Sequence, residues 1–342
     1  MKAMVLKNIS RIHGNSRPLE AADLPVPEPG EGQLLIRVSA CGVCHTELDE
    51  IEGRTPPPRF PVIPGHQVVG RVAAIGKNVR TRQPGERIGV GWIYSACGCC
   101  RFCREGNENL CRDFMATGRD ADGGYAEYML VSEDFTYALP DALSDVESAP
   151  LLCAGAIGYR SLRLTGLHDG QSLGLTGFGA SAHLVLKMVR HRYPSSKIFV
   201  FARSEKERQF ARELGAVWAG GTFDPAPEKL QAIIDTTPAW KPVTEALKNL
   251  ESGGRLVINA IRKEAADRDV LRELDYPLHL WMEKEIKSVA NVTRRDIEEC
   301  LILAAEIPLR PQIQEFPLVE ANQALAELKA GHIRGAKVLK ML

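Results

Sequence analysis

Two patterns of hydrophobic and polar positions follow one another along the chain. In the first 150 residues, short apolar runs such as 33–38 and 68–75 are separated by loops rich in Pro and Gly, at 24–30 and 55–58. Short apolar runs with this punctuation predict a β-rich unit.

From about residue 155 the periodicity changes. The chain then alternates between predicted strands at 173–176, 198–202, 232–235 and 255–260 and predicted helices at 180–192, 204–214 and 240–250. Such alternation favours βαβ units around a parallel sheet. Further along, the pattern predicts amphipathic helices at 294–306 and 319–330 and a closing strand at 336–339.

Composition narrows the class of protein. The 342 residues are 44% hydrophobic and carry 43 basic and 43 acidic side chains, and a chain of this length suggests about two domains. Balanced charge gives no general attraction to nucleic acid or to an anionic membrane. No apolar run reaches the roughly 20 residues that cross a bilayer, and the N-terminus lacks the pattern of a secretory signal. We expect a cytoplasmic protein with neither nucleic-acid nor membrane partners.

Nine cysteines point to metal chemistry, because an odd number in a cytoplasmic chain of this size argues against disulfides. Cys97, Cys100, Cys103 and Cys111 have the spacing C-x2-C-x2-C-x7-C, which predicts a closed, structural zinc site that clamps its loop. An iron–sulfur cluster is the alternative, disfavoured by the x7 gap and by the lack of a Pro after the last Cys. The fifth thiol of this loop, Cys99, is expected to point away.

Three other segments each carry one candidate metal ligand. Cys44 belongs to a C-x2-C pair, His66 follows Pro-Gly, and Cys153 lies in an apolar run. Taken singly, the pair also fits a redox site and Cys153 also fits a core position. Spacing alone is therefore weak evidence for any of the three.

In their order along the chain, these segments and the cysteine loop resemble the zinc-dependent medium-chain alcohol dehydrogenases. The resemblance covers essentially the whole chain and is most specific at 41–47, at 64–66 and in the loop. It implies a catalytic zinc held by Cys44, His66 and Cys153, with a fourth position open to water, alcohol or aldehyde. An alcohol bound there would lose its proton more readily and pass hydride to a nicotinamide cofactor.

The resemblance also implies roles for three neighbouring residues. Thr46 would be the first group of the proton relay, and His45 would lie by the cofactor pyrophosphate. Trp92, which we predict at the end of a strand 89–92, would form an aromatic wall of the substrate pocket. Plain core packing is the alternative for Trp92.

Three positions depart from the family pattern without removing a ligand. Gln67 stands where many relatives carry a Glu behind the zinc, and Asp49 where several carry the histidine that ends the proton relay. Ile157 replaces a frequent Thr near the nicotinamide. Gln67 and Asp49 leave ligand exchange and the proton exit open.

The segment 173–186 fits a strand, a tight turn and a helix. Its turn, Gly177-Phe178-Gly179-Ala180-Ser181-Ala182, has the G-x-G-x-x-A form of a dinucleotide-binding turn. The first Gly permits the turn, the second lets the backbone approach a pyrophosphate, and the small last residue lets helix pack on strand. A glycine-rich turn without a ligand is the alternative, disfavoured by the βαβ context.

The end of the next strand bears on the choice of cofactor. Ala202 stands where NAD enzymes carry an acidic residue, and Arg203 and Ser204 follow. Because an arginine suits a 2′-phosphate, NADP is favoured over NAD. The alternative is that Arg203 is a solvated residue at a helix start. The resemblance adds Arg334 as a pyrophosphate contact.

The expected architecture is α/β, with a β-rich GroES-like catalytic domain and a Rossmann domain whose parallel sheet is doubly wound. The catalytic domain comprises 1–153 and a return segment 291–342, the Rossmann domain comprises 154–290, and the active site lies between them. The expected reaction is reversible oxidation of a small alcohol to an aldehyde or ketone by a homodimer or homotetramer.

Two other functions remain open at this point. One is a zinc-independent quinone or enoyl reductase on the same scaffold, and the other is a non-enzymatic zinc protein that binds a nucleotide or nucleic acid. The full set of candidate ligands argues against both, and the balanced charge argues against nucleic acid.

Overall fold

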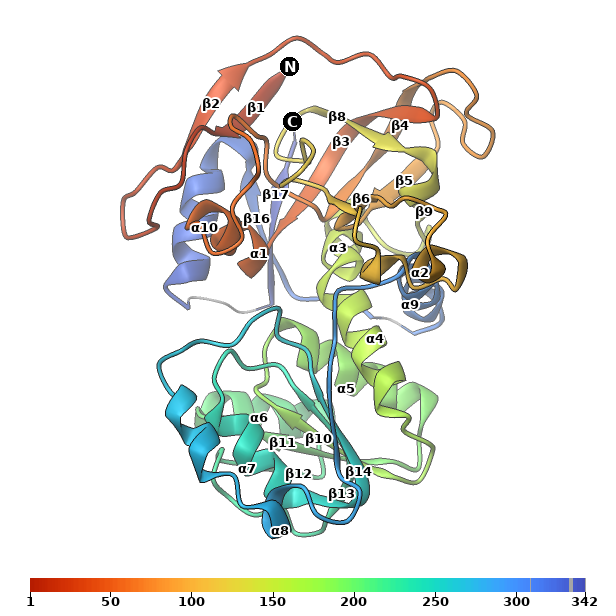
Figure 1. The fold of residues 1–342 in the computed structure, drawn as a ribbon. Helices are drawn as coiled ribbons and strands as arrows, with labels where there is room; N and C mark the ends of the chain where they lie inside the picture. Colours follow the sequence, from red (N-terminus) through yellow and green to blue (C-terminus); the bar gives the residue numbers. More distant parts are fainter. Residues whose placement is uncertain (308, 332–334, 342) are drawn as a thin grey trace. The chain divides into compact units, whose positions relative to one another are not determined.

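The computed structural model describes residues 1–307, 309–331 and 335–341 (Figure 1). The chain divides into two compact units, which are described separately below. Unit 1 comprises Met1–Cys153 and Thr293–Leu342, and unit 2 comprises Ala154–Val292. Among the described residues, no helix is both long enough and apolar enough to cross a membrane.

Unit 1 is β-rich. Its main sheet has the strand order β16-β17-β3-β4-β5-β9, with β8 paired to β3, and most neighbours are antiparallel. The strands of this sheet are β3 (Gln33–Val43), β4 (Val68–Ile75), β5 (Arg87–Val90), β8 (Tyr128–Ser132), β9 (Thr136–Ala138), β16 (Ile313–Pro317) and β17 (Ala336–Lys340). Two small sheets pair β1 (Lys2–Leu6) with β2 (Leu19–Asp23) and β6 (Ile93–Ser95) with β7 (Met115–Ala116).

Helices and short helical turns complete unit 1. The α-helices are α1 (His45–Ile51), α2 (Arg101–Arg104), α3 (Asp145–Ser148), α9 (Arg294–Glu306) and α10 (Ala321–Lys329). The 3-10 turns are η1 (Glu108–Leu110), η2 (Glu133–Phe135), η3 (Ala149–Leu152) and η5 (Leu318–Glu320). Helix α9 starts where its sequence predicts, because Thr293 and Asp296 form a reciprocal cap.

Unit 2 is a parallel sheet with helices. The strand order is β12-β11-β10-β13-β14-β15, so the first strand along the chain lies in the middle of the sheet, next to β13. The elements are α4 (Ala154–Thr165), β10 (Ser172–Thr176), α5 (Ala180–Arg192), β11 (Lys197–Phe201), α6 (Glu205–Leu214), β12 (Trp218–Gly220), β13 (Leu230–Asp235), α7 (Lys241–Asn249), β14 (Leu250–Ile258), η4 (Arg268–Glu273), α8 (Tyr276–His279) and β15 (Glu285–Ser288). This strand order is that of the Rossmann fold, in which ligands bind at the carboxyl ends of the strands beside the switch in order.

The structure changes three of the predicted elements. The strand predicted at 255–260 starts earlier, at Leu250, and ends at Ile258. The helix predicted at 319–330 begins with the 3-10 turn η5 before α10. Strand β5 ends at Val90, where its pairing with β4 and β9 stops, so Trp92 lies in the link to β6 rather than at a strand end.

Candidate metal centres and dinucleotide turn

The first candidate site brings three segments of unit 1 together. Cys44 caps α1 and accepts a hydrogen bond from the Thr46 N–H (3.4 Å), His66 precedes β4, and Cys153 follows η3. One ligand atom from each of Cys44, His66 and Cys153 lies within 4.8 Å of the others, and Cys44 Sγ lies 3.8 Å from His66 Nε2. Around a tetrahedral zinc with Zn–S of about 2.3 Å and Zn–N of about 2.0 Å, a sulfur and a nitrogen ligand are about 3.5 Å apart. The three atoms therefore have the spacing of ligands to one ion.

Glu47 orients this site, and the sequence analysis did not single it out. Its side chain is fully buried, with Oε1 at 2.5 Å from His66 Nδ1, while Oε2 accepts a hydrogen bond from the Cys44 N–H (2.8 Å). A carboxylate on the far ring nitrogen fixes the tautomer and the direction of a ligating histidine. The available signal was the position of Glu47 three residues after the cap, which is the spacing of a capping box.

The electrostatics of the site favour a bound cation. The neighbouring Cys153, burial and Glu47 together raise the pKa of the Cys44 thiol well above its ordinary value. Burial and the charge of Glu47 likewise raise the pKa of Glu50. Thiolates and a carboxylate packed this closely repel one another, and a divalent ion removes that cost. The two sulfur atoms and one imidazole suit zinc.

Of the other residues expected near the metal, Thr46 is half-buried and His45 is exposed. Trp92 is half-buried and packs on Phe114, with ring centroids 5.1 Å apart, and the Arg119 guanidinium lies over the Trp92 ring at 5.6 Å. Trp92 thus belongs to a cluster in unit 1 in which two aromatic rings pack together and the Arg119 guanidinium lies over the Trp92 ring.

Of the three departures from the family pattern, Gln67 and Asp49 are buried, and Ile157 in α4 is half-buried. A methyl group added to Gly42 would lie 2.4 Å from Gln67 Oε1, so the Gln67 amide packs directly on the β3 backbone. Asp49 forms an ion pair with Arg54.

The second candidate site is the cysteine loop. The sulfur atoms lie 3.9 Å (Cys97–Cys103), 3.6 Å (Cys100–Cys103) and 3.5 Å (Cys111–Cys97) apart. These distances suit thiolates arranged around one ion and are too long for disulfide bonds, and all nine cysteines are free thiols. Cys99 is exposed and lies outside the cluster. Hydrogen bonds from the loop backbone, that of Cys100 first, lower the pKa of Cys97 to about 6.

Unit 2 carries the glycine turn at the carboxyl end of β10. Gly177 has φ of +76°, which a side chain disfavours, and Gly179 caps α5. A methyl group added to Gly179 would meet no protein atom within 4 Å, so there is open space above this position. Phe178 is buried against Phe210, and Ala180 begins α5. The turn, the space and the helix N-terminus form a surface suited to a pyrophosphate.

The three residues that follow β11, Ala202, Arg203 and Ser204, differ in exposure and in hydrogen bonding. Ala202 is buried, while Arg203 is exposed. Ser204 caps α6, and its hydroxyl donates to Glu207 Oε2 at 2.9 Å. Arg208 donates to the carbonyls of Ala202 (2.8 Å) and Arg203 (3.0 Å) and so fixes this loop. Arg203 is thus the cation of the loop that remains exposed, whereas the Ser204 hydroxyl is already bonded. Arg334 lies outside the described residues.

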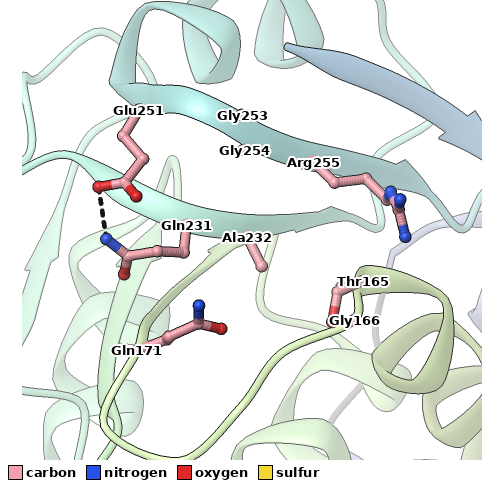
Figure 2. A pocket seen from close by; sticks show the side chains of 9 residues that line it. All are labelled: Thr165, Gly166, Gln171, Gln231, Ala232, Glu251, Gly253, Gly254 and Arg255. Atoms are coloured by element: carbon pink, nitrogen blue, oxygen red, sulfur yellow. Dashed lines mark hydrogen bonds between the residues drawn. The ribbon is translucent and has the colours of Figure 1, made fainter. Parts of the chain in front are cut away.

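A polar hollow of about 230 Å³ lies elsewhere in unit 2 (Figure 2). It is lined by the end of α4 and by β13 and β14, and across it the Gln231 amide donates to Glu251 at 2.5 Å. Gln231 and Glu251 lie near the starts of their strands, at the edge of the sheet away from the glycine turn. The hollow contains none of the candidate ligands or turn residues.

The comparisons with known proteins agree with this geometry. Residues 30–141 match the alcohol dehydrogenase GroES-like domain. The chain is 42% identical over 327 residues to a probable alcohol dehydrogenase, AdhA, of Mycobacterium tuberculosis, a match that covers 94% of this chain and 92% of the relative. The chain belongs to the zinc-dependent medium-chain alcohol dehydrogenase family. The family and the fold class predicted from the sequence are confirmed.

Two further relatives align with this chain over nearly the full length of both proteins. An alcohol dehydrogenase of Geobacillus stearothermophilus is 32% identical over 100% of this chain and 99% of its own. The solved structure of a cinnamyl alcohol dehydrogenase of Sorghum bicolor is 25% identical, with a TM-score of 0.82, over 99% of this chain and 97% of that chain. The protein is therefore an alcohol dehydrogenase.

Proposed function

We propose that the protein is a zinc-dependent alcohol dehydrogenase that uses NAD(P). The observation that carries the proposal is the convergence of Cys44, His66 and Cys153, whose ligand atoms lie within 4.8 Å of one another. These three would hold a catalytic zinc, which supplies a Lewis acid that makes an alcohol hydroxyl more acidic and polarises a carbonyl. The cysteine loop would hold a structural zinc.

The chain's own residues account for the rest of the chemistry. The two thiolates would offset the charge of the ion, and Glu47 would keep the Nε2 of His66 directed at it. The Thr46 hydroxyl, two residues past a ligand, would take the proton of the alcohol. The glycine turn and α5 would bind the cofactor pyrophosphate, and the exposed guanidinium of Arg203 favours NADP.

The test compares Cys153→Ala with Cys300→Ala. Cys300 is a buried thiol of α9 that belongs to neither cluster, so its variant controls for the loss of a buried sulfur. We expect Cys153→Ala to lose alcohol oxidation and to bind one zinc per chain instead of two, while Cys300→Ala keeps both. Near-normal kcat in Cys153→Ala would show that the catalytic assignment is wrong.

We infer that the protein assembles as a homodimer, or as a homotetramer built from such dimers, through the edge of the unit 2 sheet. Strand β15 is exposed along its whole length, and within the part of the chain that the structure describes it pairs with β14 alone. The exposed apolar side chains Trp281, Met282 and Ile286 lie at or just before this edge, and open apolar edges are sites of association. Light scattering should give at least twice the 37.6 kDa chain mass, and Ile286→Lys should lower it to that of one chain. A monomeric wild type would contradict the assignment.

A further inference from the structure

A buried ion pair lies at the carboxyl ends of the strands in unit 2. Asp235 is the last residue of β13 and is fully buried, and its partner Lys263 is 7% exposed. Besides Asp235 Oδ2, the Lys263 ammonium donates to the carbonyls of Thr237 (2.8 Å) and Ala239 (2.9 Å). An ammonium has three donors, so Lys263 uses all of them within the protein and none for a ligand.

The Asp235 carboxylate joins the segments that follow three strands. Its Oδ1 accepts from the hydroxyl of Thr176 at the end of β10 (2.6 Å) and from that of Thr237 (2.7 Å). Its Oδ2 accepts from Lys263, which follows β14. One side chain thus fixes the connections after β10, β13 and β14 to one another.

This corner supports the glycine turn directly. A methyl group added to Gly177 would lie 2.9 Å from Thr236 Oγ1 and 3.0 Å from Thr237 Cγ2. Thr236 in turn donates through its N–H (3.0 Å) and its hydroxyl (2.9 Å) to the carbonyl of Thr176. The position of the turn therefore depends on residues 236–237, which the ion pair holds.

The ion pair also fixes one end of the segment that follows β14. At the other end, the Asn259 N–H donates to the Asp235 carbonyl (2.8 Å) and its amide donates to Ser161 Oγ on α4 (2.7 Å). Between these anchors the apolar side chain of Ile261 is 55% exposed. A segment fixed at both ends, at the carboxyl edge of a Rossmann sheet, is in place to line the dinucleotide site.

We propose that Lys263 is a positioning residue for the dinucleotide. Paired with Asp235, it holds residues 236–240 and 259–264 in the arrangement that the cofactor requires, without touching the cofactor itself. A buried ion pair adds little net stability compared with a neutral pair of similar size. Its contribution here is therefore to fix the conformation of these two segments. This inference rests on the proposed use of NAD(P).

The test is dinucleotide binding to the full chain, followed by nicotinamide fluorescence with NADPH and NADH. Asp235→Asn combined with Lys263→Met removes both charges and leaves neither partner ionised. We expect the Kd for both dinucleotides to rise about 10-fold, which means that the competent arrangement is populated about a tenth of the time. Zinc content and kcat at saturating cofactor should stay near wild type.

Two further variants keep the test decisive. The control is Lys197→Met with Glu228→Gln, which removes another ion pair of unit 2 (2.7 Å). Lys197 begins β11, so this pair lies at the amino ends of the strands, away from the glycine turn. The control should leave Kd unchanged. Lys263→Arg keeps the charge but spreads its donors over a planar fork, so a folded protein with a raised Kd is expected even if the double variant fails to fold.

Three results would overturn the inference. The first is a wild-type Kd in the folded double variant or in Lys263→Arg, and the second is an equal loss of binding in the Lys197 and Glu228 control. The third is a wild-type protein that binds neither dinucleotide, which would overturn the proposed cofactor use as well and is thereby distinguishable from the other two.

Discussion

Replacing Arg203 tests how the protein chooses its cofactor. Ala202 offers no acceptor to a ribose 2′-hydroxyl, while the exposed guanidinium of Arg203 can bind a 2′-phosphate. A charge-assisted hydrogen bond contributes about 1.5–3 kcal/mol, which corresponds to a preference of about 10- to 150-fold. Because Arg203 is exposed, screening by solvent and salt places the expected kcat/KM ratio of NADP over NAD near the lower end, about 10-fold.

The assay is the initial rate of alcohol oxidation at varied NADP and varied NAD. Ala202→Asp with Arg203→Ile should reverse the preference, since it adds an acceptor and removes the cation. Lys206→Ala removes an exposed charge in the first turn of α6, three residues after Arg203, and should leave the ratio unchanged. A wild type that prefers NAD, or a Lys206 variant that loses as much selectivity as the Arg203 variant, would refute the reasoning.

Two other predictions concern stability. Cys103→Ser should lower both the zinc content and the melting temperature, because the binding energy of a structural site is also folding energy; unchanged values by metal analysis and calorimetry would refute the site. Burial raises the pKa of Glu52, but hydrogen bonds from Lys329 (2.6 Å) and Arg54 outweigh this and hold it at about 2, below its ordinary value of 4.5. Glu52 therefore stabilises the fold fully above its unfolded pKa, and this stabilisation is lost as pH falls toward 2. Glu52→Gln should lower the melting temperature at pH 7 and flatten its fall between pH 5 and 3, and parallel curves for both proteins would contradict the pairing.

The sequence predicts best those elements whose ends carry local signals. Helices α5 and α9 have the predicted bounds, since Gly179 precedes one and the Thr293–Asp296 cap begins the other. Strands β12 and β15 were not predicted, because β12 has three residues and β15, Glu-Ile-Lys-Ser, is exposed and has only one apolar residue. Their pairing in the sheet is decided by neighbouring strands rather than by their own pattern.

The candidate site divides in the same way. The cysteine loop is local, so its spacing alone predicted the cluster that the structure forms. The second set comes from residues far apart, and only the family resemblance linked Cys44, His66 and Cys153 in advance. Nothing local marked Lys263, because its partner Asp235 is 28 residues away and becomes a neighbour only when β13 and β14 pair.

Helix α1 shows how one local signal can serve both folding and chemistry. Cys44 is at once the cap of this helix and a candidate ligand, and Glu47 at once completes the cap and binds His66. An ion at the site would therefore stabilise the start of α1, and an intact α1 would hold two of the ligand positions in register. Glu47 is fully buried, so a carboxylate at this position needs compensation within the protein, and His66 together with the zinc that we propose for this site would supply it. The proposed metal would thus account for the acidic residue at this position as well as the helix cap does.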